Sequence, residues 1–435
     1  MCFDAGGIGP RRHLQGLANV RPMEAEPDQE TEQRRRPSST RRRALPLAVL
    51  ALVVLAAAGI YALADPFSDD DQSAVAGEGL ASIVRDCSKA VDGEINDFLA
   101  SVPNGATVKF PKGGCYRQHD SIWMRDRKDI VVDGNGSTFA FDTTTDAKKN
   151  YRSNWRIWRG SGITLKNMTI RGACKPKQCR NGSLPPPKDG YGQHGINLES
   201  TADPVIDRVH VRDALSDGIS AEGTLNPRCC WRGPATSNLV LKNSHVERAG
   251  RMLIGITDLD GGLIEGNRIE NNPMAGIDIE VDTPGFKGRR IRIVDNTFDN
   301  IHAQIIANGG LGSDPDVAEI TIEGNSMVSR SKACAGGIFL RSPGPKPKSY
   351  RTGYVVRNNK LKLIGAMVQA ERIKDLTIEG NTTDHKAVGC GEKGAVELLD
   401  SHGVDIKAND FSGYPKEVYA DPAATGVSVA PRSGG

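Results

Sequence analysis

Three carboxylate residues, Asp278, Glu280 and Asp282, alternate along one short stretch of the chain. In a strand, residues two apart have Cα atoms roughly 6.5–7 Å apart and side chains on the same side. That spacing is close to the separation of the two carboxyl groups that protonate a leaving group and activate a water in an inverting glycosidase. Repulsion among carboxylates also raises one pKa, as an acid catalyst requires. Asp278 and Glu280 are therefore a candidate acid and base pair.

The same carboxylates have two other interpretations. Their oxygens are hard ligands, so Asp278, Glu280 and Asp282 could hold a Ca²⁺ ion. Arg251 or Lys287 could then act in a lyase that removes a proton from an acidic sugar. The plainer interpretation is that outward strand positions are polar and commonly acidic. Clustering favours a function, because like charges side by side across strands cost stability.

A second set of candidates precedes the strands of neighbouring repeats. His194 lies in a Gln-His-Gly run and Asp217 in a Ser-Asp-Gly run, so we expect the two side chains to lie close together. They could form a proton-transfer pair, although turn residues bonded to the backbone would explain them equally well. Arg251 enters the next repeat at nearly the same place, where its guanidinium could neutralise a uronate carboxylate.

Further candidates for substrate binding lie in insertions and at outward strand positions. Residues 173–193 and 223–237 interrupt the repeats, and loops of about 15 to 20 residues on a regular scaffold are commonly functional. Their Tyr191 and Trp231 could stack on sugar rings, although shielding a disulfide is the plainer account. The outward candidates are Glu199, Glu222 and Arg341.

A repeat along the chain must position all of these residues. Short apolar strands end near a turn-like Asn, and a self-similar period of this size without helical patterns predicts a β-solenoid. We assign the stacked Asn side chains a structural role, because the amide bonds the backbone and its neighbour and tolerates left-handed geometry. The repeated positions are Asn167, Asp207, Asn243, Asn267, Asn296, Asn325, Asn358, Asn381 and Asn409.

Each repeat also carries a second strand in which apolar and polar residues alternate. Such alternation places one side chain toward the core and the next toward solvent. In a parallel solenoid, equivalent positions of successive coils stack about 4.8 Å apart. The predicted core column is Ile196, Ile219, Ile277, Ile338 and Val396. The predicted exposed face contains Asn197, Glu199, Ser220, Glu222, Asp278, Glu280, Phe339 and Arg341.

A resemblance to a known superfamily rests on the segment before the repeats. Residues 104–113 read Asn-Gly-Ala-Thr-Val-Lys-Phe-Pro-Lys-Gly, and Ile-Val-Val-Asp-Gly-Asn-Gly follows at 130–136. This resembles the start of pectate-lyase-like right-handed parallel β-helix proteins, and repeats continue it through residues 160–412. It implies an all-β right-handed parallel β-helix of about nine or ten coils.

The resemblance is specific for the fold and not for the reaction. The superfamily includes lyases, glycosidases, epimerases, esterases and phage tailspikes. The polygalacturonase motifs Gly-His-Gly, Asn-Thr-Asp and Asp-Asp are missing at coil positions, and the run containing His194 is only a partial likeness to the first.

One helix is expected before the first strands. Val91, Ile95, Phe98 and Leu99 recur at helical spacing, with Ser88 as a possible N-cap. Because a solenoid exposes an apolar end, we expect this helix to cover it. The predicted β-helix domain is 81–415, and 416–435 is a C-terminal tail.

The N-terminal part predicts a membrane anchor. Residues 1–43 form a basic, disordered cytoplasmic tail, residues 44–64 are uninterrupted in their apolar character, and 65–80 form an acidic linker. Twenty-one residues at about 1.5 Å each span a bilayer, and the preceding arginines place the N-terminus in the cytoplasm. A cleaved signal peptide ending near Ala64 is the alternative, and Met23 could also serve as the start.

The cysteines agree with export. Eight of the nine lie beyond the apolar segment, which favours disulfides. The plausible pairs are Cys174 with Cys179, Cys87 with Cys115, and Cys334 with Cys390. Zinc is the weaker alternative, because no Cys-x-x-Cys pair or accompanying His cluster occurs at ligand spacing.

These observations predict a membrane-anchored, extracellular β-helix. The first functional hypothesis is a lyase or glycoside hydrolase acting on an acidic or cell-surface glycan, with Ca²⁺ as a candidate cofactor. The second is a glycan-binding or surface-structural protein without activity, and the third is a uronate epimerase. The net charge of +3 gives no indication of nucleic acid, and no such partner is expected.

Overall fold

A computed structural model describes residues 78–142, 152–175, 193–226, 231–281, 283–309, 316–329, 336–342, 350–362, 365–384 and 392–430. The chain divides into two units, 1–71 and 72–435, and every described residue belongs to the second. The expected cytoplasmic tail, membrane helix and all but the last residues of the linker lie outside the described residues. No helix within the described ranges is long and apolar enough to cross a membrane.

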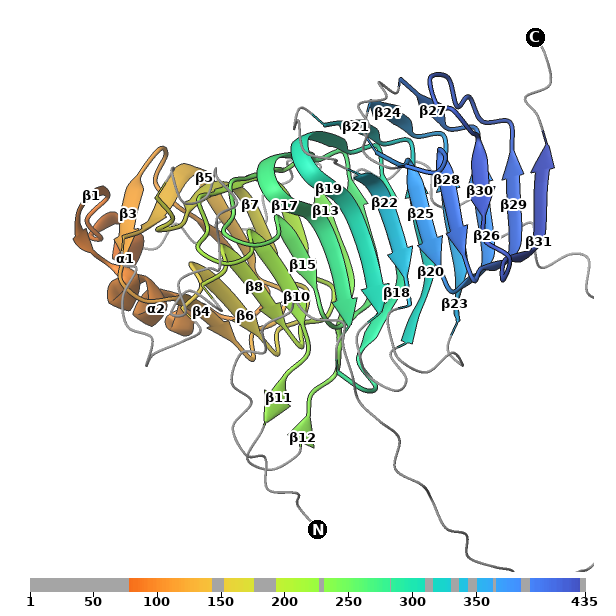
Figure 1. Cartoon of the computed structure of the whole chain (residues 1–435). Coiled ribbons are helices and arrows are strands. Elements are labelled where there is room, and N and C mark those ends of the chain that lie inside the picture. The colour runs from red at the N-terminus through yellow and green to blue at the C-terminus, as the bar shows by residue number, and fades with distance from the viewer. Residues whose placement is uncertain are drawn as a thin grey trace, which may run out of the picture. The chain divides into compact units, whose positions relative to one another are not determined.

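The second unit is a stack of parallel strands wound into successive coils (Figure 1). Each coil contributes to as many as three parallel sheets, and some strands bend from one sheet into the next. This arrangement confirms the predicted parallel β-helix.

The first sheet carries most of the candidate residues. It contains β4 (Ile122–Arg125), β6 (Trp155–Trp158), β8 (Ile196–Glu199), β10 (Ile219–Glu222), β15 (Ile254–Ile256), the end of β17 (Arg268–Val281), the end of β19 (Thr297–Gly309), β22 (Gly336–Arg341), β25 (Val368–Glu371), β28 (Val396–Leu399) and β30 (Val418–Ala420).

The second sheet contains β2 (Thr107–Lys109), the starts of β5 (Val131–Phe141), β7 (Thr164–Arg171) and β9 (Val205–Arg212), then β13 (Thr236–Lys242), β16 (Leu259–Glu265), β18 (Lys287–Val294), β20 (Asp316–Glu323), β23 (Arg351–Arg357), β26 (Ile373–Glu379), β29 (His402–Lys407) and β31 (Thr425–Ala430).

The third sheet contains β1 (Asp86–Ala90), β3 (Cys115–Gln118), the ends of β5, β7 and β9, β14 (His245–Glu247), the starts of β17 and β19, β21 (Ser326–Val328), β24 (Lys360–Lys362) and β27 (Thr382–Thr383). A separate antiparallel hairpin, β11 (Leu225–Asn226) and β12 (Trp231–Arg232), extends from the insertion after β10.

The predicted core column of the first sheet is confirmed but incomplete. All five of its members are at most 1% exposed. Three coils that the repeat alignment missed lie between them, and they contribute Ile254, Ile305 and Val368 to the same column. The predicted exposed face is only partly exposed, because Asn197, Ser220 and Asp278 are at most 4% exposed.

The repeated Asn positions separate into two neighbouring columns. The buried column has Asn359 where Asn358 was predicted, and its amides bond from coil to coil: the Asn296 backbone N–H donates to Asn325 Oδ1 over 2.9 Å, and Asn325 donates likewise to Asn359. Asn167, Asn243 and Asn358 lie one position earlier, in the left-handed turn with φ of 50–55°. The structural role predicted for the Asn repeat is thus divided between hydrogen bonding and turn geometry.

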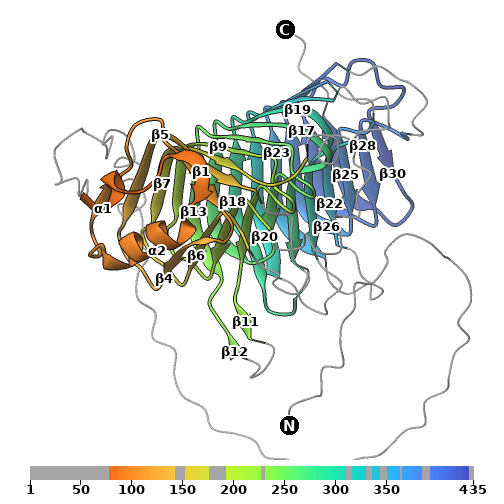
Figure 2. The same ribbon diagram turned by 90° about the vertical axis from the view of Figure 1, so that its left-hand side faces the viewer.

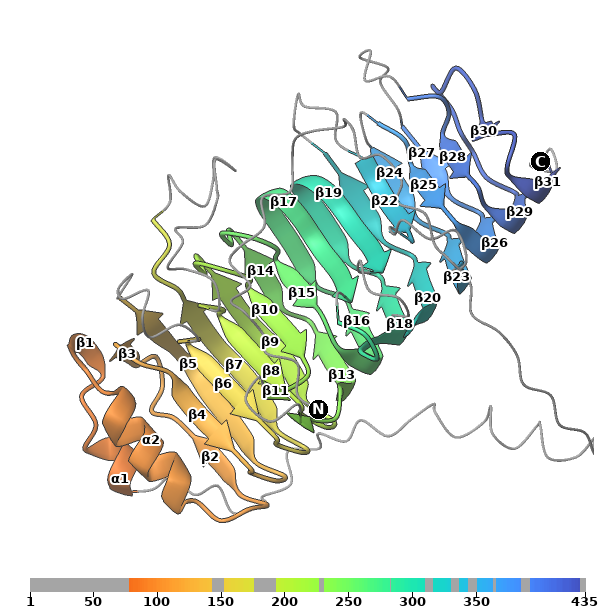
Figure 3. The same cartoon turned by 60° about the horizontal axis from the view of Figure 1, so that its bottom comes forward.

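Two helices precede the coils, α1 (Glu78–Ala81) and α2 (Asp92–Ser101), and α2 lies beside β4 at the N-terminal end of the stack (Figures 2 and 3). Ile95 and Leu99 of α2 are buried, and Asn96 accepts a hydrogen bond of 2.7 Å from the Trp123 backbone N–H. Ser88 is not the N-cap as predicted. It lies in β1, because the helix begins only at Asp92.

The predicted disulfide between Cys87 and Cys115 is present, with Cα atoms 5.0 Å apart, and it joins β1 to β3. Cys174 is also disulfide-bonded, to a partner outside the described residues. Cys179, Cys334 and Cys390 lie outside the described ranges, so the other two pairs stay predictions. Residues 416–435 are not simply a tail, because β30 and β31 extend the stack into them.

Candidate functional site

Four neighbouring coils place one outward position each in a row across the first sheet. Strand register aligns Asn197 with Ser220, Ser220 with Gly255, and Gly255 with Asp278. Glu199 and Glu222 form the next row, two residues further along the strands. The parallel stacking therefore brings together residues that are about 80 positions apart in sequence.

A chain of ionic contacts connects most of the predicted catalytic residues. His194 Nδ1 lies 3.3 Å from Asp217 Oδ2, and Arg251 Nε lies 3.7 Å from Asp217 Oδ1. The other end of the same guanidinium reaches Glu280, with 3.4 Å between Nη2 and Oε2. The predicted proximity of His194, Asp217, Arg251 and Glu280 is thus present in the fold.

Asp217 is held in its ionised form. Burial alone would raise the pKa of this carboxyl, but the positive charge of Arg251 and the hydrogen bond with His194 outweigh it, so the pKa lies below its ordinary value. The backbone N–H of Met252 donates a further hydrogen bond of 3.1 Å to Oδ1. Asp217 is only 4% exposed, so its position is fixed by the coils on both sides.

The pKa of Glu222 is shifted in the opposite direction to that of Asp217. Burial raises the pKa of its carboxyl and the negative charge of Glu199 adds to this, while His194, Asn197 and Arg156 only partly offset the shift. Asn197 Nδ2 donates a hydrogen bond to Glu222 Oε1, and Arg156 pairs with Glu199. A partly buried carboxyl with a raised pKa can carry a proton at a pH where Asp217 is ionised.

The two carboxyls share one neighbour, His194, and turn to different strands. Gly255 has no side chain, and a Cβ added there would lie 2.9 Å from Asp217 Oδ2. The Asp217 carboxylate therefore occupies the place that a side chain at position 255 would take, and Asp278 aligns with that place from the next coil. On the adjacent strand β10, Ser220 faces Gly255, whereas Glu222 bonds Asn197 of β8 and interacts with the charge of His194.

This arrangement can support acid and base chemistry. Two carboxyl groups whose environments push their pKa values apart are a recurring means of running both roles in one site. His194 and Arg251 orient the ionised member. The sequence identified the participants but assigned the acid and base roles to Asp278 and Glu280, whereas Glu280 is ion-paired with Arg251.

The remaining predicted residues do not all lie near the candidate site. Arg341 lies on the same sheet two coils beyond Glu280, where it bonds Gln369 and lies over the Phe339 ring. Trp231 is in the β11–β12 hairpin, and its side chain is not described. Tyr191 and Asp282 lie outside the described residues, so the three-carboxylate calcium site stays a prediction. Lys287 is not near the site as proposed, because it pairs with Asp260 on the second sheet.

The sequence interpretation missed aromatic and basic residues at the start of the same sheet. Trp123 and Arg125 of β4 and Arg156 and Trp158 of β6 occupy the outward positions of the coils before β8. Their strands show the same apolar and polar alternation as the later ones. That alternation was the available signal, but these strands follow Ser121 and Asn154 rather than the Gly or Ala that was used to align the repeats.

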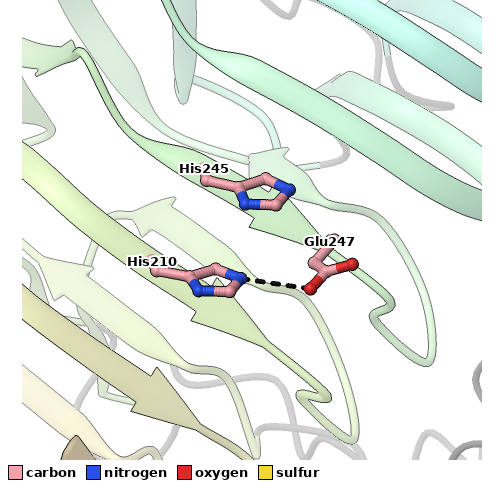
Figure 4. Close-up of side chains that lie close together, drawn as sticks. All are labelled: His210, His245 and Glu247. Atoms are coloured by element: carbon pink, nitrogen blue, oxygen red, sulfur yellow. Dashed lines mark hydrogen bonds and ion pairs between the residues drawn. The ribbon is translucent and has the colours of Figure 1, made fainter.

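A separate cluster of titratable groups lies on the third sheet. His210 and His245 stack with ring centroids 4.4 Å apart and an interplanar angle of 6°, and Glu247 lies beside them (Figure 4). His210 Nε2 is 3.1 Å from Glu247 Oε1, and His245 Nε2 is 2.9 Å from Glu270 Oε1. The His210, His245 and Glu247 ligand atoms lie within 4.8 Å of one another, as in a possible metal site. We call His210, His245, Glu247 and Glu270 the His–Glu ladder.

Comparisons with known proteins agree with the architecture. The family described as right handed beta helix region matches residues 116–280 and 156–361. No curated protein matches the chain.

Three solved structures with similar folds are distant from this chain in sequence. The chain is similar to the A-module of a mannuronan C-5 epimerase from Azotobacter vinelandii, at 14% identity and TM-score 0.53, covering 81% of this chain and 96% of that one. A family 28 exopolygalacturonase from Yersinia enterocolitica gives 12% identity and TM-score 0.53, covering 80% and 76%.

The tailspike protein of E. coli bacteriophage HK620, solved in complex with a pentasaccharide, gives 11% identity and TM-score 0.51 over 80% of this chain. The chain spans 62% of the tailspike's length. At these identities the likeness concerns the fold alone.

Proposed function

Since the chain belongs to the right-handed β-helix family and carries two carboxyls with opposed pKa shifts that both interact with His194, we propose that it acts on a polysaccharide. The reaction that the site supports best is hydrolysis of a glycosidic bond. The observation that carries this proposal is that Glu222, with its raised pKa, and Asp217, with its lowered pKa, both interact with His194 on neighbouring coils.

Each residue has a defined role in this proposal. Glu222 donates a proton to the oxygen of the leaving sugar, and Asp217 accepts a proton from the attacking water. His194 and Arg251 position Asp217 and keep it ionised. Asp278 and Glu280 lie on β17, the strand next to that of Gly255, and bind sugar hydroxyls. A Ca²⁺ ion held by Asp278, Glu280 and Asp282 would compete with Arg251 for Glu280, so no step is assigned to it.

The opposed shifts define the expected pH profile. Activity needs Glu222 protonated and Asp217 ionised. It should therefore fall as pH rises through the Glu222 pKa, which lies above the ordinary 4.5. It should also fall as pH drops through the Asp217 pKa, which lies below the ordinary 3.8. Both values are those of the free enzyme and are read from the profile of kcat/KM.

Product analysis tests the proposal. The full-length protein is incubated with acidic and neutral polysaccharides, and new reducing ends are measured together with ultraviolet absorbance of unsaturated sugars. Reducing ends without absorbance are expected, and they should disappear in Glu222→Gln but not in Glu379→Gln, which removes a partly exposed carboxylate on the second sheet.

Other outcomes assign other functions. Absorbance that depends on Ca²⁺ indicates a lyase, and inverted uronate configuration without cleavage indicates an epimerase, a reaction that shares proton abstraction with a lyase. If the parent protein binds polysaccharide but changes none of it, the non-catalytic alternative replaces the enzymatic one.

We also infer that residues 44–64 anchor the protein in a membrane with the β-helix outside the cell, and that α2 covers the N-terminal end of the core. The first inference rests on the apolar run and its preceding arginines, the second on the buried face of α2. Membrane fractions that release the protein with detergent but not with alkaline carbonate would support the anchor. Recovery of a soluble form beginning near Asp65 would show cleavage instead.

A further inference from the structure

Four side chains form a compact group at the N-terminal end of the first sheet. Trp123 and Arg125 lie outward on β4, and the register places Arg156 of β6 beside Trp123 and Trp158 beside Arg125. Aromatic and basic residues thus alternate both along the strands and across them. We call Trp123, Arg125, Arg156 and Trp158 the Trp–Arg patch.

The guanidinium groups of the patch are held against the indole rings. The Arg125 Cζ lies 5.0 Å from the Trp123 ring centroid and 4.7 Å from that of Trp158. Arg156 lies 4.7 Å from Trp123. Trp158 is fixed in turn by a hydrogen bond of 3.0 Å from Nε1 to Thr224 Oγ1. Cation–π contacts of this kind hold a planar guanidinium in place and leave its N–H edge available to an anion.

The charges of the patch are not all compensated. Arg156 pairs with Glu199, and the neighbouring Arg159 pairs with Asp126 over 2.6 Å. Arg125 is exposed, and within the described part of the chain no carboxylate pairs with it. A hollow of about 390 Å³ lined by Trp123, Arg125 and residues of α2 lies next to it. The patch therefore presents one positive group beside an open space.

The patch is continuous with the candidate site. Trp158 is aligned with Glu199, and Glu199 with Glu222. At about 4.8 Å per coil, the distance from β4 to β10 is roughly 14 Å, which an extended oligosaccharide spans. Positive charge at β4 and β6 is followed by acidic residues at β10 and β17. A ligand lying along the sheet should therefore be anionic over the patch.

We propose that the Trp–Arg patch is a subsite for the carboxylate of an acidic sugar residue, in a glycan that continues over the candidate site. The proposal rests on the proposed function, which supplies the glycan. It adds that the substrate is negatively charged and that Arg125 recognises this charge. Arg125 accepts the carboxylate in its N–H fork, and the indole rings shield this contact from water. Single-stranded nucleic acid would also use aromatic and basic residues, but its phosphates would meet the carboxylates of the following coils.

Binding measurements with matched probes test the subsite. The full-length Glu222→Gln protein, in which turnover should be blocked, is titrated with polygalacturonate, alginate and hyaluronan, each beside its carboxyl-reduced form. At least one acidic form should bind, and its reduced form should not. Arg125→Gln should weaken that binding at least about tenfold, as expected for loss of a charge-assisted hydrogen bond. Arg292→Gln, an exposed strand arginine on the second sheet, is the control and should change it less than about twofold.

Several results would overturn the proposal: no binding of any acidic form, equal binding of a reduced form, or an unchanged affinity in Arg125→Gln. Binding of oligothymidylate that needs Arg125, without binding of the glycans, would replace the sugar with nucleic acid. Failure of the proposed function would give a different experimental result from failure of the subsite. A glycan that binds through Arg125 but is never altered by the parent protein removes the enzymatic role and leaves the subsite intact.

Discussion

The candidate site on the first sheet and the His–Glu ladder on the third sheet are built from similar residues, and their arrangement differs. In the ladder, His210 bonds Glu247 of the next coil and His245 bonds Glu270 of the coil after. The repeat supplies each imidazole with its own carboxylate. Around Asp217 the repeat is interrupted, because Gly255 places no side chain in the row.

The two regions differ in whether the stacking of equivalent positions satisfies their polar groups. Where equivalent positions carry complementary groups, stacking satisfies them within the scaffold. Where one coil omits its side chain, a neighbouring carboxylate occupies the place and is bonded by groups outside the row, as Asp217 over Gly255 is by His194 and Arg251. We expect functional positions of this fold to be found where the repeat fails.

The largest expected effect is a difference in activity between a variant of the candidate site and a variant of the His–Glu ladder. Asp217→Asn removes the ionised carboxylate and should lower kcat/KM by about 10²–10⁴-fold, the range found for general acid–base groups. Glu247→Gln removes a carboxylate of the ladder and should leave activity within about twofold. Both are measured as reducing ends released per minute from the best substrate. Equal losses in the two variants would contradict the comparison.

A smaller effect is expected from adding a methyl group at position 255, where the Asp217 carboxylate lies. In Gly255→Ala the new methyl group would lie 2.9 Å from Asp217 Oδ2, so the carboxylate must move, and activity should fall at least about tenfold. Gly93→Ala is the matched control, because nothing lies within 4 Å of the added Cβ. Thermal melting of both variants shows whether the loss is local. Full activity in Gly255→Ala would mean that the position of the Asp217 carboxylate over Gly255 is not needed for the reaction.

Protonation of the His–Glu ladder should change the stability of the protein rather than its activity. Burial, followed by the charge of His245, lowers the pKa of His210 below its ordinary 6.5 despite the opposing effect of Glu247. A lowered histidine pKa favours the neutral form in the folded state. Its contribution to stability is therefore present above pH 6.5 and is lost as pH falls below that value. Denaturant melts at pH 7.5 and 5.5 should differ by less in His210→Gln than in the parent protein.

The smallest effect concerns metal binding by the ladder. Zinc ligands converge on one ion with Zn–N distances of about 2.0–2.1 Å. The two imidazoles instead lie parallel, with 6° between their planes, and each bonds a different glutamate. We expect Zn²⁺ and Ni²⁺ to leave the melting temperature unchanged. Calorimetric binding that disappears in His245→Gln would show that the ladder rearranges into a metal site.

The solenoid could be predicted from the sequence because each sequence repeat corresponds to one coil of the structure. The coils that it missed, those of Ile254, Ile305 and Val368, have Leu253, Gln304 and Met367 where the aligned strands have Gly or Ala. Ser121 and Asn154 stand at that position before Ile122 and Trp155, so the Trp–Arg patch was missed as well. Strand alternation was intact in all of them, so alternation was the better guide.

The site could be predicted only in part. The turn positions of His194, Asp217 and Arg251 indicated their proximity, because register alone determines it. The role of Glu222 could not be predicted, since the pKa of its carboxyl depends on burial by neighbouring coils and on Glu199, Asn197 and Arg156 around it. Gly255 carries no chemical signal in a sequence, although its lack of a side chain leaves room for the Asp217 carboxylate.

The stacked asparagines have a consequence for how the chain folds. Asn267 bonds Asn296 and Asn296 bonds Asn325, each 29 residues further along the chain. Contacts of such limited range mean that a coil can dock as soon as the preceding one exists, as in other repeat proteins. A protein emerging N-terminus first could thus begin to order near α2 and the Cys87–Cys115 bridge, and lengthen coil by coil while its C-terminal half is still being made.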